Sequence, residues 1–220
     1  MLKFFTRRQW ILVGYLPIHL LWFFILEAAV TVDYTPIHCA LDDLVPFCEW
    51  FIFPYFLWFP YMVGTGLYFR FKDDRAFEHF MLMLVIGFFI CTLICSVFPN
   101  GQDLRPNVYS DNFAAQIIRA AQIFDTNTNV FPSMHVVGAL GTAVAIAKSQ
   151  MLKKKRWLQL GNALFCVLIL LATVFLKQHS VLDIFAGVAV FIPVYVLVYT
   201  GCAGRLLTKI EKLLFKTSPG

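Results

Sequence analysis

The stretch that decides the fold runs from Lys177 to Ala203 and reads KQHSVLDIFAGVAVFIPVYVLVYTGCA. From Val181 to its end it is almost entirely apolar, and Asp183 is its one charged residue. A helix needs about 20 mostly apolar residues to cross a bilayer. The stretch therefore predicts a transmembrane helix over Val181–Ala203, with a short polar segment directly before it.

The composition of the whole chain supports the same class. Of its 220 residues, 60% are hydrophobic and 14% are charged, and the mean hydropathy is +0.72. Soluble domains carry about 25% charged residues, so this chain has too few charges to solvate a globule of its size. The composition excludes a disordered tail, a secreted disulfide-rich domain and a nucleic-acid-binding module. It predicts an all-α integral membrane protein with one domain over residues 1–220.

Segments with the length and apolar composition of membrane helices recur along the chain. The second of them contains Pro54 and Pro60, which predict a kink, and the fourth is short for a span. Together the segments predict a six-transmembrane-helix bundle, with spans at Gln9–Val32, Phe47–Phe69, Phe77–Val97, Pro132–Ala147, Trp157–Leu176 and Val181–Ala203.

Lysine and arginine orient such a bundle, because short loops rich in them stay in the cytoplasm. Here 15 of the 18 fall in the two tails and in the second and fourth loops, and only Arg105, Arg119 and Lys177 fall elsewhere. We therefore expect both termini to be cytoplasmic and the loops at 33–46, 98–131 and 177–180 to face the outside or a lumen. The basic side needs no nucleic-acid partner, since it can contact anionic lipid headgroups.

The longest outer loop, residues 98–131, is of a length that is often functional. It contains a short amphipathic segment, Ala114–Ile123, and it leads into Phe131-Pro132-Ser133-Met134-His135. Proline suits the first turn of a helix and serine can cap it. His135 then lies beside free backbone N–H groups that favour an anion. It could donate a proton to that anion or simply anchor the helix at the interface, and its position alone does not decide.

His179 and Asp183 lie four residues apart, so they share one face of a helix start. A carboxylate beside one imidazole nitrogen fixes the tautomer and raises the basicity of the other nitrogen; the alternative is an ion pair without chemistry. Arg105 has a planar fork that suits phosphate, although alone it reads as a solvated loop arginine. Because these groups and His135 fall on one predicted membrane face, they indicate metal-free phosphoryl transfer through a phosphohistidine.

At these residues the chain resembles the type 2 phosphatidic acid phosphatase superfamily of membrane lipid phosphatases and phosphotransferases. The motifs of that family are KxxxxxxRP, PSGH and SRxxxxxHxxxD, in this order. They are matched here by Arg105-Pro106, by Pro132-Ser133-Met134-His135 and by His179 with Asp183. The resemblance places the catalytic core at about residues 77–203 and implies the six-span layout.

The resemblance also implies a role for each matched residue and requires no metal or cofactor. His179 is then the nucleophile, Asp183 orients it, and His135 protonates the leaving group. The phosphate is then bound by Arg105 and by the backbone N–H groups of Ser133 and Met134.

Some motif positions differ from the family pattern. The motif lysine is replaced by Phe98, the Ser-Arg pair by Ala172-Thr173, and the motif glycine by Met134. Two phosphate-binding cations are therefore missing; Lys177 either replaces one of them or is an interface lysine. Similar losses occur in the inositolphosphorylceramide-synthase and sphingomyelin-synthase branch, which transfers a phospho-headgroup to a lipid alcohol.

The leading hypothesis is hydrolysis of a lipid phosphomonoester or pyrophosphate at the outer membrane face. The main alternative is transfer of an inositol- or choline-phosphate type headgroup to ceramide or diacylglycerol. A transporter or proton relay built around Glu27, His135, His179 and Asp183 is a further alternative, and so is an inactive scaffold. A zinc site at His179 and Asp183 lacks a convincingly spaced third ligand.

Overall fold

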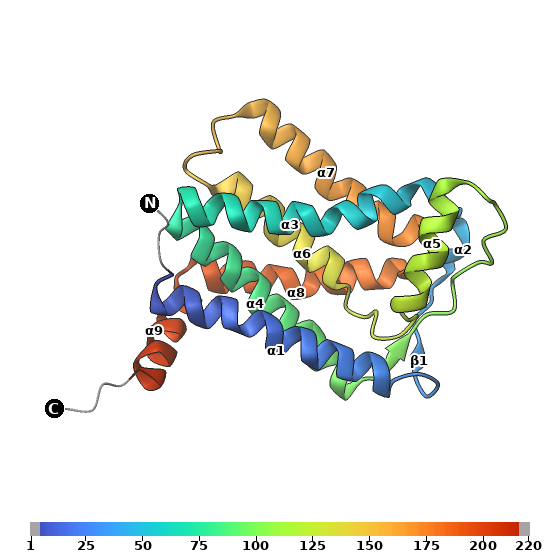
Figure 1. The fold of residues 1–220 in the computed structure, drawn as a ribbon, viewed down its shortest axis with the longest axis horizontal. Coiled ribbons are helices and arrows are strands. Elements are labelled where there is room, and N and C mark those ends of the chain that lie inside the picture. The colour runs from blue at the N-terminus through green and yellow to red at the C-terminus, as the bar shows by residue number, and fades with distance from the viewer. Residues whose placement is uncertain (1–4, 216–220) are drawn as a thin grey trace.

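The chain folds into a bundle of long helices, with short elements gathered at one end (Figure 1). The computed structural model describes residues 5–215. The elements in chain order are α1 (Arg7–Ala29), β1 (Thr35–Pro36), α2 (Ala40–Leu44), η1 (Glu49–Phe51), α3 (Ile52–Lys72), α4 (Asp74–Val97), β2 (Asn100–Gly101), α5 (Phe113–Phe124), α6 (Met134–Lys148), α7 (Arg156–Phe175), α8 (Val181–Tyr199) and α9 (Cys202–Leu214).

Each predicted span contains a helix, which confirms the all-α class. Within the described residues, α1, α4, α7 and α8 are long and apolar enough to cross a membrane. The helix α6 is apolar but has only 15 residues. The helix α3 has 21 residues and contains many aromatic side chains and Pro60, and it is not among these apolar helices. The structure thus supports an integral membrane protein, and the six-span count and the orientation of the termini stay predictions.

Two predicted boundaries shift for identifiable reasons. The last span ends at Tyr199 rather than Ala203, because Gly201 adopts the left-handed backbone (φ 78°) and starts a separate helix, α9. The second span starts at Ile52 rather than Phe47. Pro54 therefore lies in the first turn of α3, where a missing N–H removes no intrahelical hydrogen bond.

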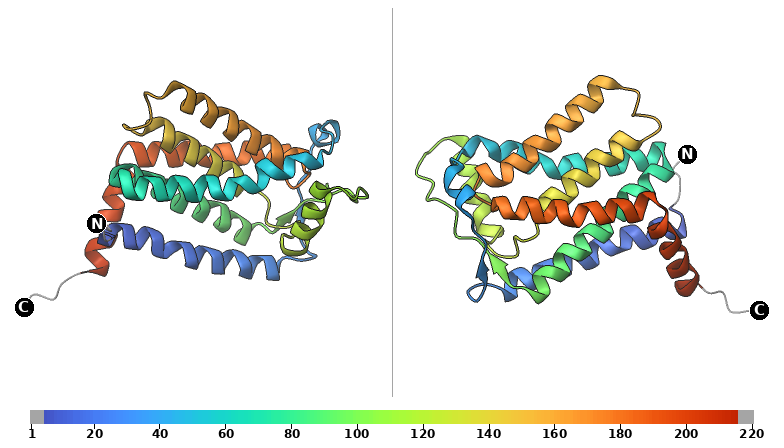
Figure 2. Two further views of the ribbon diagram at one scale, coloured as in Figure 1. Left: turned by 45° about the horizontal axis from the view of Figure 1, so that its top comes forward. Right: turned by 180° about the vertical axis from the view of Figure 1, so that it is seen from behind.

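The helices α4 and α6 form the centre of the bundle. The helix α4 packs against α1, α3, α6 and α8, and α6 also packs against α3, α7 and α8. A Cβ on Gly87 of α4 would lie 2.5 Å from Cγ1 of Val137 on α6, so this glycine allows the two helices to approach closely. The two views of Figure 2 show α1 and α7 on the outside of this arrangement.

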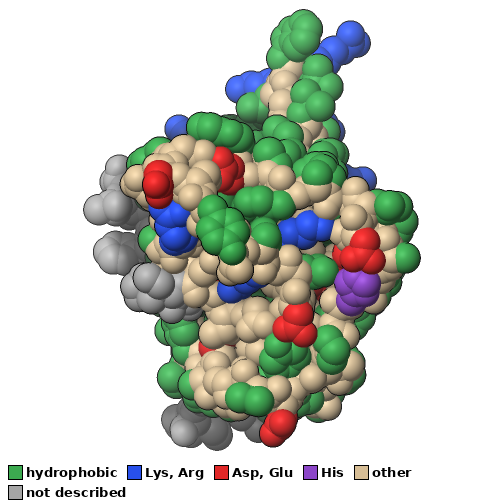
Figure 3. Space-filling model, turned by 90° about the vertical axis from the view of Figure 1, so that its right-hand side faces the viewer, with side chains coloured by type: hydrophobic (Ala, Val, Ile, Leu, Met, Phe, Trp, Pro, Cys, Tyr) green, Lys and Arg blue, Asp and Glu red, His purple; other side chains and the backbone are tan. Residues whose placement is uncertain are grey.

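The loops at 33–46 and 98–131 lie together at the end of the bundle opposite both termini (Figure 1). The strand β1 pairs in parallel with β2, and Gly101 also bridges Thr128. The helix α5 covers the predicted amphipathic segment and is capped by Asn112, which accepts a hydrogen bond from Ala115 N at 2.9 Å. Seen from this end (Figure 3), the surface carries both acidic and basic side chains. We call it the loop end.

Candidate active site

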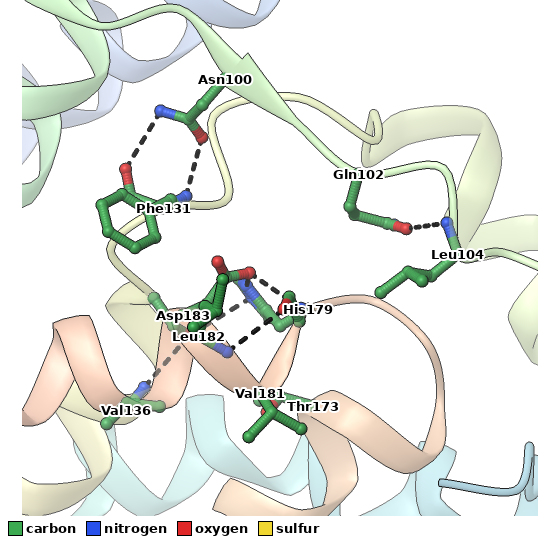
Figure 4. Close-up of polar contacts among 12 residues, drawn as sticks. Asn100, Gln102, Leu104, Phe131, Val136, Thr173, His179, Val181, Leu182 and Asp183 are labelled. Atoms are coloured by element: carbon green, nitrogen blue, oxygen red, sulfur yellow. Dashed lines mark hydrogen bonds and ion pairs between the residues drawn. The ribbon is translucent and has the colours of Figure 1, made fainter. Parts of the chain in front are cut away.

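The start of α8 holds His179 against Asp183, as the four-residue spacing predicts. Ser180 caps the helix, and its Oγ accepts a hydrogen bond from Leu182 N at 3.1 Å. Asp183 Oδ2 accepts from Ser180 N and is 3.0 Å from His179 Nδ1 (Figure 4). His179 lies before the capping residue. The contact forms because the chain before the cap folds back over the first turn of the helix.

This contact fixes the imidazole. The Asp183 side chain is fully buried and His179 is 7% exposed. A carboxylate only accepts, so Nδ1 carries the proton and Nε2 keeps its lone pair. The nearest polar atom to Nε2 among the described contacts is Ser133 Oγ, at 3.3 Å. His179 therefore presents its Nε2 lone pair to the start of α6.

The turn between α7 and α8 sets the position of His179. Lys177 adopts a left-handed backbone (φ 55°), which reverses the chain. The backbone N–H groups of Gln178 and His179 then both donate to Thr173 O at 3.0 Å. Thr173 is part of the position that the family motif gives to a Ser-Arg pair, and here it holds the backbone of the turn that carries His179.

Asp42, on α2 in the first outer loop, closes the same turn from outside. Its carboxylate accepts from Ser180 Oγ at 2.6 Å and from Val181 N at 2.7 Å. Burial raises the pKa of Asp42, but the hydrogen bonds from Ser180, Val181 and Cys39 outweigh burial and hold the pKa below its ordinary value. The sequence analysis missed Asp42, because nothing local relates it to a residue 138 positions away.

Lys177 also binds this loop. Its ammonium donates to the backbone carbonyl of Asp42 at 2.5 Å. The predicted phosphate ligand is therefore engaged by α2 in this structure, and its contact joins the first outer loop to the turn that carries His179.

The start of α6 carries the second histidine. Ser133 caps the helix by accepting from Val136 N at 3.4 Å. Just before it, the buried Asn100 side chain makes two hydrogen bonds with the backbone of Phe131, at 2.8 and 3.1 Å (Figure 4). His135 follows on the first turn, and its ring centroid lies 5.5 Å from that of His179.

Aromatic side chains of α3 hold His135. Its ring stacks on Tyr55 and packs against Trp58, with centroid distances of 4.3 Å in both cases. Its buried Nε2 makes no hydrogen bond within the described residues. Tyr55 and Trp58 are three residues apart and so share one helix face. That spacing was the one feature of the sequence that could have indicated these two residues.

Close helix contacts bring these parts together. A Cβ on Gly187 of α8 would lie 2.8 Å from Cβ of Val136, and a Cβ on Gly138 of α6 would lie 2.8 Å from Cζ2 of Trp58. Larger residues would push α8 and α3 away from the start of α6. These two glycines therefore allow the histidines to lie side by side.

Some backbone N–H groups at the start of α6 are hydrogen-bonded within the protein, and others are available to a ligand. The N–H of Ser133, a predicted phosphate ligand, lies 3.3 Å from Asp183 O and donates to it. The first intrahelical hydrogen bond runs from Val137 N to Ser133 O, so the N–H groups of Met134 and His135 come before it, at the open end of the helix. These two N–H groups are the ones available to an anion.

Arg105 is held by the far end of its own loop. Its two Nη atoms donate to the backbone carbonyls of Asp125 and Thr126, both at 2.7 Å, and Nη2 lies 3.6 Å from the Asp125 carboxylate. It borders a recess of about 520 Å³ that Gln102 and Gln122 also line. The guanidinium is therefore partly neutralised, and its buried Nε has no partner among the described residues.

Asp125 connects Arg105 with the histidines. Its Oδ2 accepts a hydrogen bond from Tyr55 Oη at 3.4 Å, and Tyr55 stacks on His135. Burial raises the pKa of the Asp125 carboxyl, and the charge of Arg105 lowers it only in part. The sequence analysis missed this residue as well, because the loop must fold before Asp125 reaches the site.

Glu27, the intramembrane carboxylate of the transport hypothesis, has a structural contact instead. Its Oε1 accepts from Asn129 Nδ2 at 2.9 Å, and its Oε2 accepts from the Thr126 hydroxyl. It therefore joins α1 to the loop that carries Asp125. Within the described residues, no three His, Cys, Asp or Glu side chains are placed to hold a metal ion.

The assembled site contains a buried, oriented imidazole and, beside it, a second imidazole on the first turn of α6, whose start is open. Comparison with known families identifies a match: the model of the PAP2 superfamily matches residues 78–203, which is more than half of the chain. No curated protein matches the chain, and no solved structure matches it.

Proposed function

Because the chain belongs to the PAP2 superfamily, we propose that it cleaves a phosphate ester of a membrane lipid through a phosphohistidine at His179. The family suggests phosphatase or phosphotransferase activity on phosphate esters. The observation that carries the proposal is the line of contacts from Asp183 through His179 to Ser133, with His135 beside it.

In the first step, His179 Nε2 attacks the phosphorus and the bond from phosphorus to the lipid oxygen breaks. His135 gives a proton to that oxygen, so the lipid leaves as an alcohol. Asp183 stabilises the positive charge that develops on the His179 ring. The negative phosphate favours the protonated form of His135 before the step. In the second step, water attacks the phosphorus, the phosphorus–nitrogen bond breaks, and His135 takes the proton from the water.

Ser133 has to change partners during this reaction. In this proposal its hydroxyl first donates to the Nε2 lone pair, since Asp183 holds the proton on Nδ1. When the phosphorus takes that lone pair, the hydroxyl is free to donate to a phosphate oxygen. Together with the N–H groups of Met134 and His135, it forms a small set of donors aimed at the developing charge.

A specific observation favours transfer of a phospho-headgroup to a lipid alcohol as a second candidate reaction. Arg105 is engaged by two carbonyls and by Asp125, and two motif cations are absent from the sequence. A site with so little free positive charge suits a phosphodiester, which carries one negative charge, better than a phosphomonoester, which carries up to two. In this reaction the hydroxyl of the second lipid replaces water in the second step.

The side of the membrane is also part of the proposal. The site lies at the loop end, opposite both termini (Figure 1), and most lysines and arginines belong to the other end. Because basic loops stay in the cytoplasm, we place the reaction at the extracytoplasmic or lumenal face.

A two-arm lipid assay tests the reaction. Purified protein receives phosphatidic acid in one arm, and a phosphodiester lipid with ceramide or diacylglycerol in the other. Release of inorganic phosphate supports hydrolysis, whereas a new phospholipid supports transfer. The His179→Ala variant is the control in both arms. If the wild-type protein and this variant give the same products at the same rate, the proposed function is wrong.

A further inference from the structure

A groove lies at the opposite end of the bundle from the candidate active site. The helix α7 diverges from α3 toward the end that carries both termini (Figure 1). Between them lies a cavity of about 520 Å³, lined by Gly64, Thr65 and Phe69 of α3 and by Gly161 and Phe165 of α7, with Lys155 at its edge. We call it the α3–α7 groove.

The walls of this groove leave room for a ligand. A Cβ added to Gly64 or to Gly161 would meet nothing within 4 Å. The floor is closed by Ile146 of α6. The polar Asn162 amide is already used, because it accepts from Tyr61 Oη at 2.6 Å and donates to Ala143 O at 2.9 Å. The free interior is therefore apolar and has the form of a trough between two helices.

The groove is separate from the catalytic site. Its α3 residues run from Tyr61 to Phe69, which spans about 12 Å at 1.5 Å per residue. Tyr55, the α3 residue that stacks on His135, lies before them on the other side of Tyr61. A lipid in the groove would therefore sit in the membrane leaflet opposite the loop end.

Lys155, at the edge of the groove, belongs to a run of cations. The segment from Lys153 to Arg156 contains four cations in a row, and all four are exposed. None of them has an ion-pair partner within the part of the chain that the structure describes. Basic pockets between membrane helices bind anionic lipid headgroups. A second copy of this chain would bring the same cations and be repelled.

We propose that the α3–α7 groove binds one acyl chain of an anionic phospholipid, whose headgroup phosphate lies against Lys153–Arg156. The apolar trough would bind the acyl chain, the cations would bind the headgroup phosphate, and the two glycines leave the space that the acyl chain needs. This site is independent of the catalytic reaction.

Photo-crosslinking in vesicles tests the proposal. Full-length protein is reconstituted in phosphatidylcholine with a minor fraction of phosphatidylglycerol that carries a photoactivatable group on its acyl chain. Mass spectrometry then maps the labelled peptides. We expect the label on α3 and α7 peptides around Gly64 and Gly161. Label spread evenly over the outer helices, or crosslinks between two copies at this groove, would overturn the proposal.

Variants separate the two parts of the site. Gly161→Leu and Gly64→Leu fill the groove and should each reduce labelling several-fold. The matched control is Gly14→Leu on α1, where a Cβ also meets nothing within 4 Å, and it should label like wild type. Lys154→Gln and Lys155→Gln should each lower the preference for phosphatidylglycerol over an equally reactive phosphatidylcholine by about fivefold. Equal labelling by the two lipids in the wild-type protein would contradict the headgroup assignment.

The catalytic site provides a last control. His179→Ala should be labelled in the groove as strongly as the wild type. Loss of groove labelling in this variant would mean that the lipid was bound as a substrate, and the independent site would then be excluded.

Discussion

Two helix starts meet at the candidate site, and they differ in the charge of the side chains that bind their backbone N–H groups. The start of α8 receives two carboxylates: Asp183 from inside the helix and Asp42 from the first outer loop. The start of α6 receives one neutral cap, Ser133, and leaves the N–H groups of Met134 and His135 before the first intrahelical bond. Helix starts attract anions. The start of α8 is occupied by carboxylates of the protein itself, whereas the start of α6 can accept an anion from a ligand.

This difference assigns a task to each helix. Carboxylates at the start of α8 hold the turn that carries His179 and repel a phosphate from that helix end. The neutral start of α6 can accept the phosphate, close to the Nε2 lone pair of His179. In the proposed reaction, the turn before α8 therefore supplies the nucleophile and the start of α6 supplies the anion site.

The largest effect is expected on the α8 side from His179→Ala. Removing a nucleophile from a group of residues that act together costs about 10⁴-fold or more in turnover. We expect turnover to fall to the background level while the helical circular dichroism signal stays unchanged. Turnover within tenfold of wild type would show that His179 does not attack the phosphorus.

Asp183→Asn removes the charge and keeps the shape. The amide can no longer fix the proton on Nδ1 of His179, so turnover should fall by about 10³–10⁴-fold. Asp111→Asn, at a side chain that is 98% exposed, is the control and should leave turnover unchanged. If the two variants have equal turnover, the charge of Asp183 has no role in orienting the nucleophile.

His135→Ala breaks the α6 side. Loss of a general acid costs about 10²–10⁴-fold, and the cost depends on the leaving group. For a lipid substrate the loss should be large, whereas for an aryl phosphodiester with an acidic phenol it should be much smaller. Equal losses for both substrates would assign His135 to substrate binding rather than to proton transfer.

Asp42→Asn tests the outer carboxylate at α8 and should have the smallest effect. The Asp42 carboxylate accepts hydrogen bonds on two oxygens, whereas an amide has only one acceptor oxygen. We therefore expect kcat to fall about tenfold with little change in KM. Asp43→Asn, at a side chain that is 68% exposed, is its control. An unchanged kcat in the Asp42 variant would show that α2 does not position His179.

The pH dependence of unfolding gives a second readout for Asp42. Its pKa in the folded protein lies below the ordinary value, so its contribution to stability is complete above the unfolded pKa of about 4 and is lost as the pH falls through the folded pKa. The wild-type protein should therefore lose more stability on acidification than Asp42→Asn. Identical pH profiles would contradict the depressed pKa.

Local spacing explains which parts of the site could be predicted. His179 and Asp183 are close in sequence, so their contact could be predicted, although His179 lies in the turn before α8 rather than on its face. Ser133 caps α6 as expected, but Pro132 then lies before the helix rather than in its first turn. The contacts of Asp42 and Asp125 depend on how loops fold over helices far away in the chain. Sequence spacing carries no such information, and both residues were missed.

The same limit affects the predicted phosphate ligands. Arg105 and Lys177 were singled out because they are rare cations on the outer side. In the folded chain, Arg105 donates to the carbonyls of Asp125 and Thr126, and Lys177 donates to that of Asp42. Free carbonyls at loop and helix ends compete for cations, and their positions become known only with the fold. The boundaries of α3 and α8 also depend on the folded backbone. The apolar composition continues past the residues at which each helix starts or ends, so composition alone misplaces these boundaries.

The central claim is that a phosphoryl group is transferred to His179 at the open start of α6. It is tested most directly by mixing the protein briefly with a lipid substrate labelled in the phosphate, quenching under conditions that preserve phosphohistidine, and locating the label by mass spectrometry. We expect the label on His179 of the wild-type protein and no label on the His179→Ala variant. A label on another residue, or turnover without any labelled protein, would contradict it.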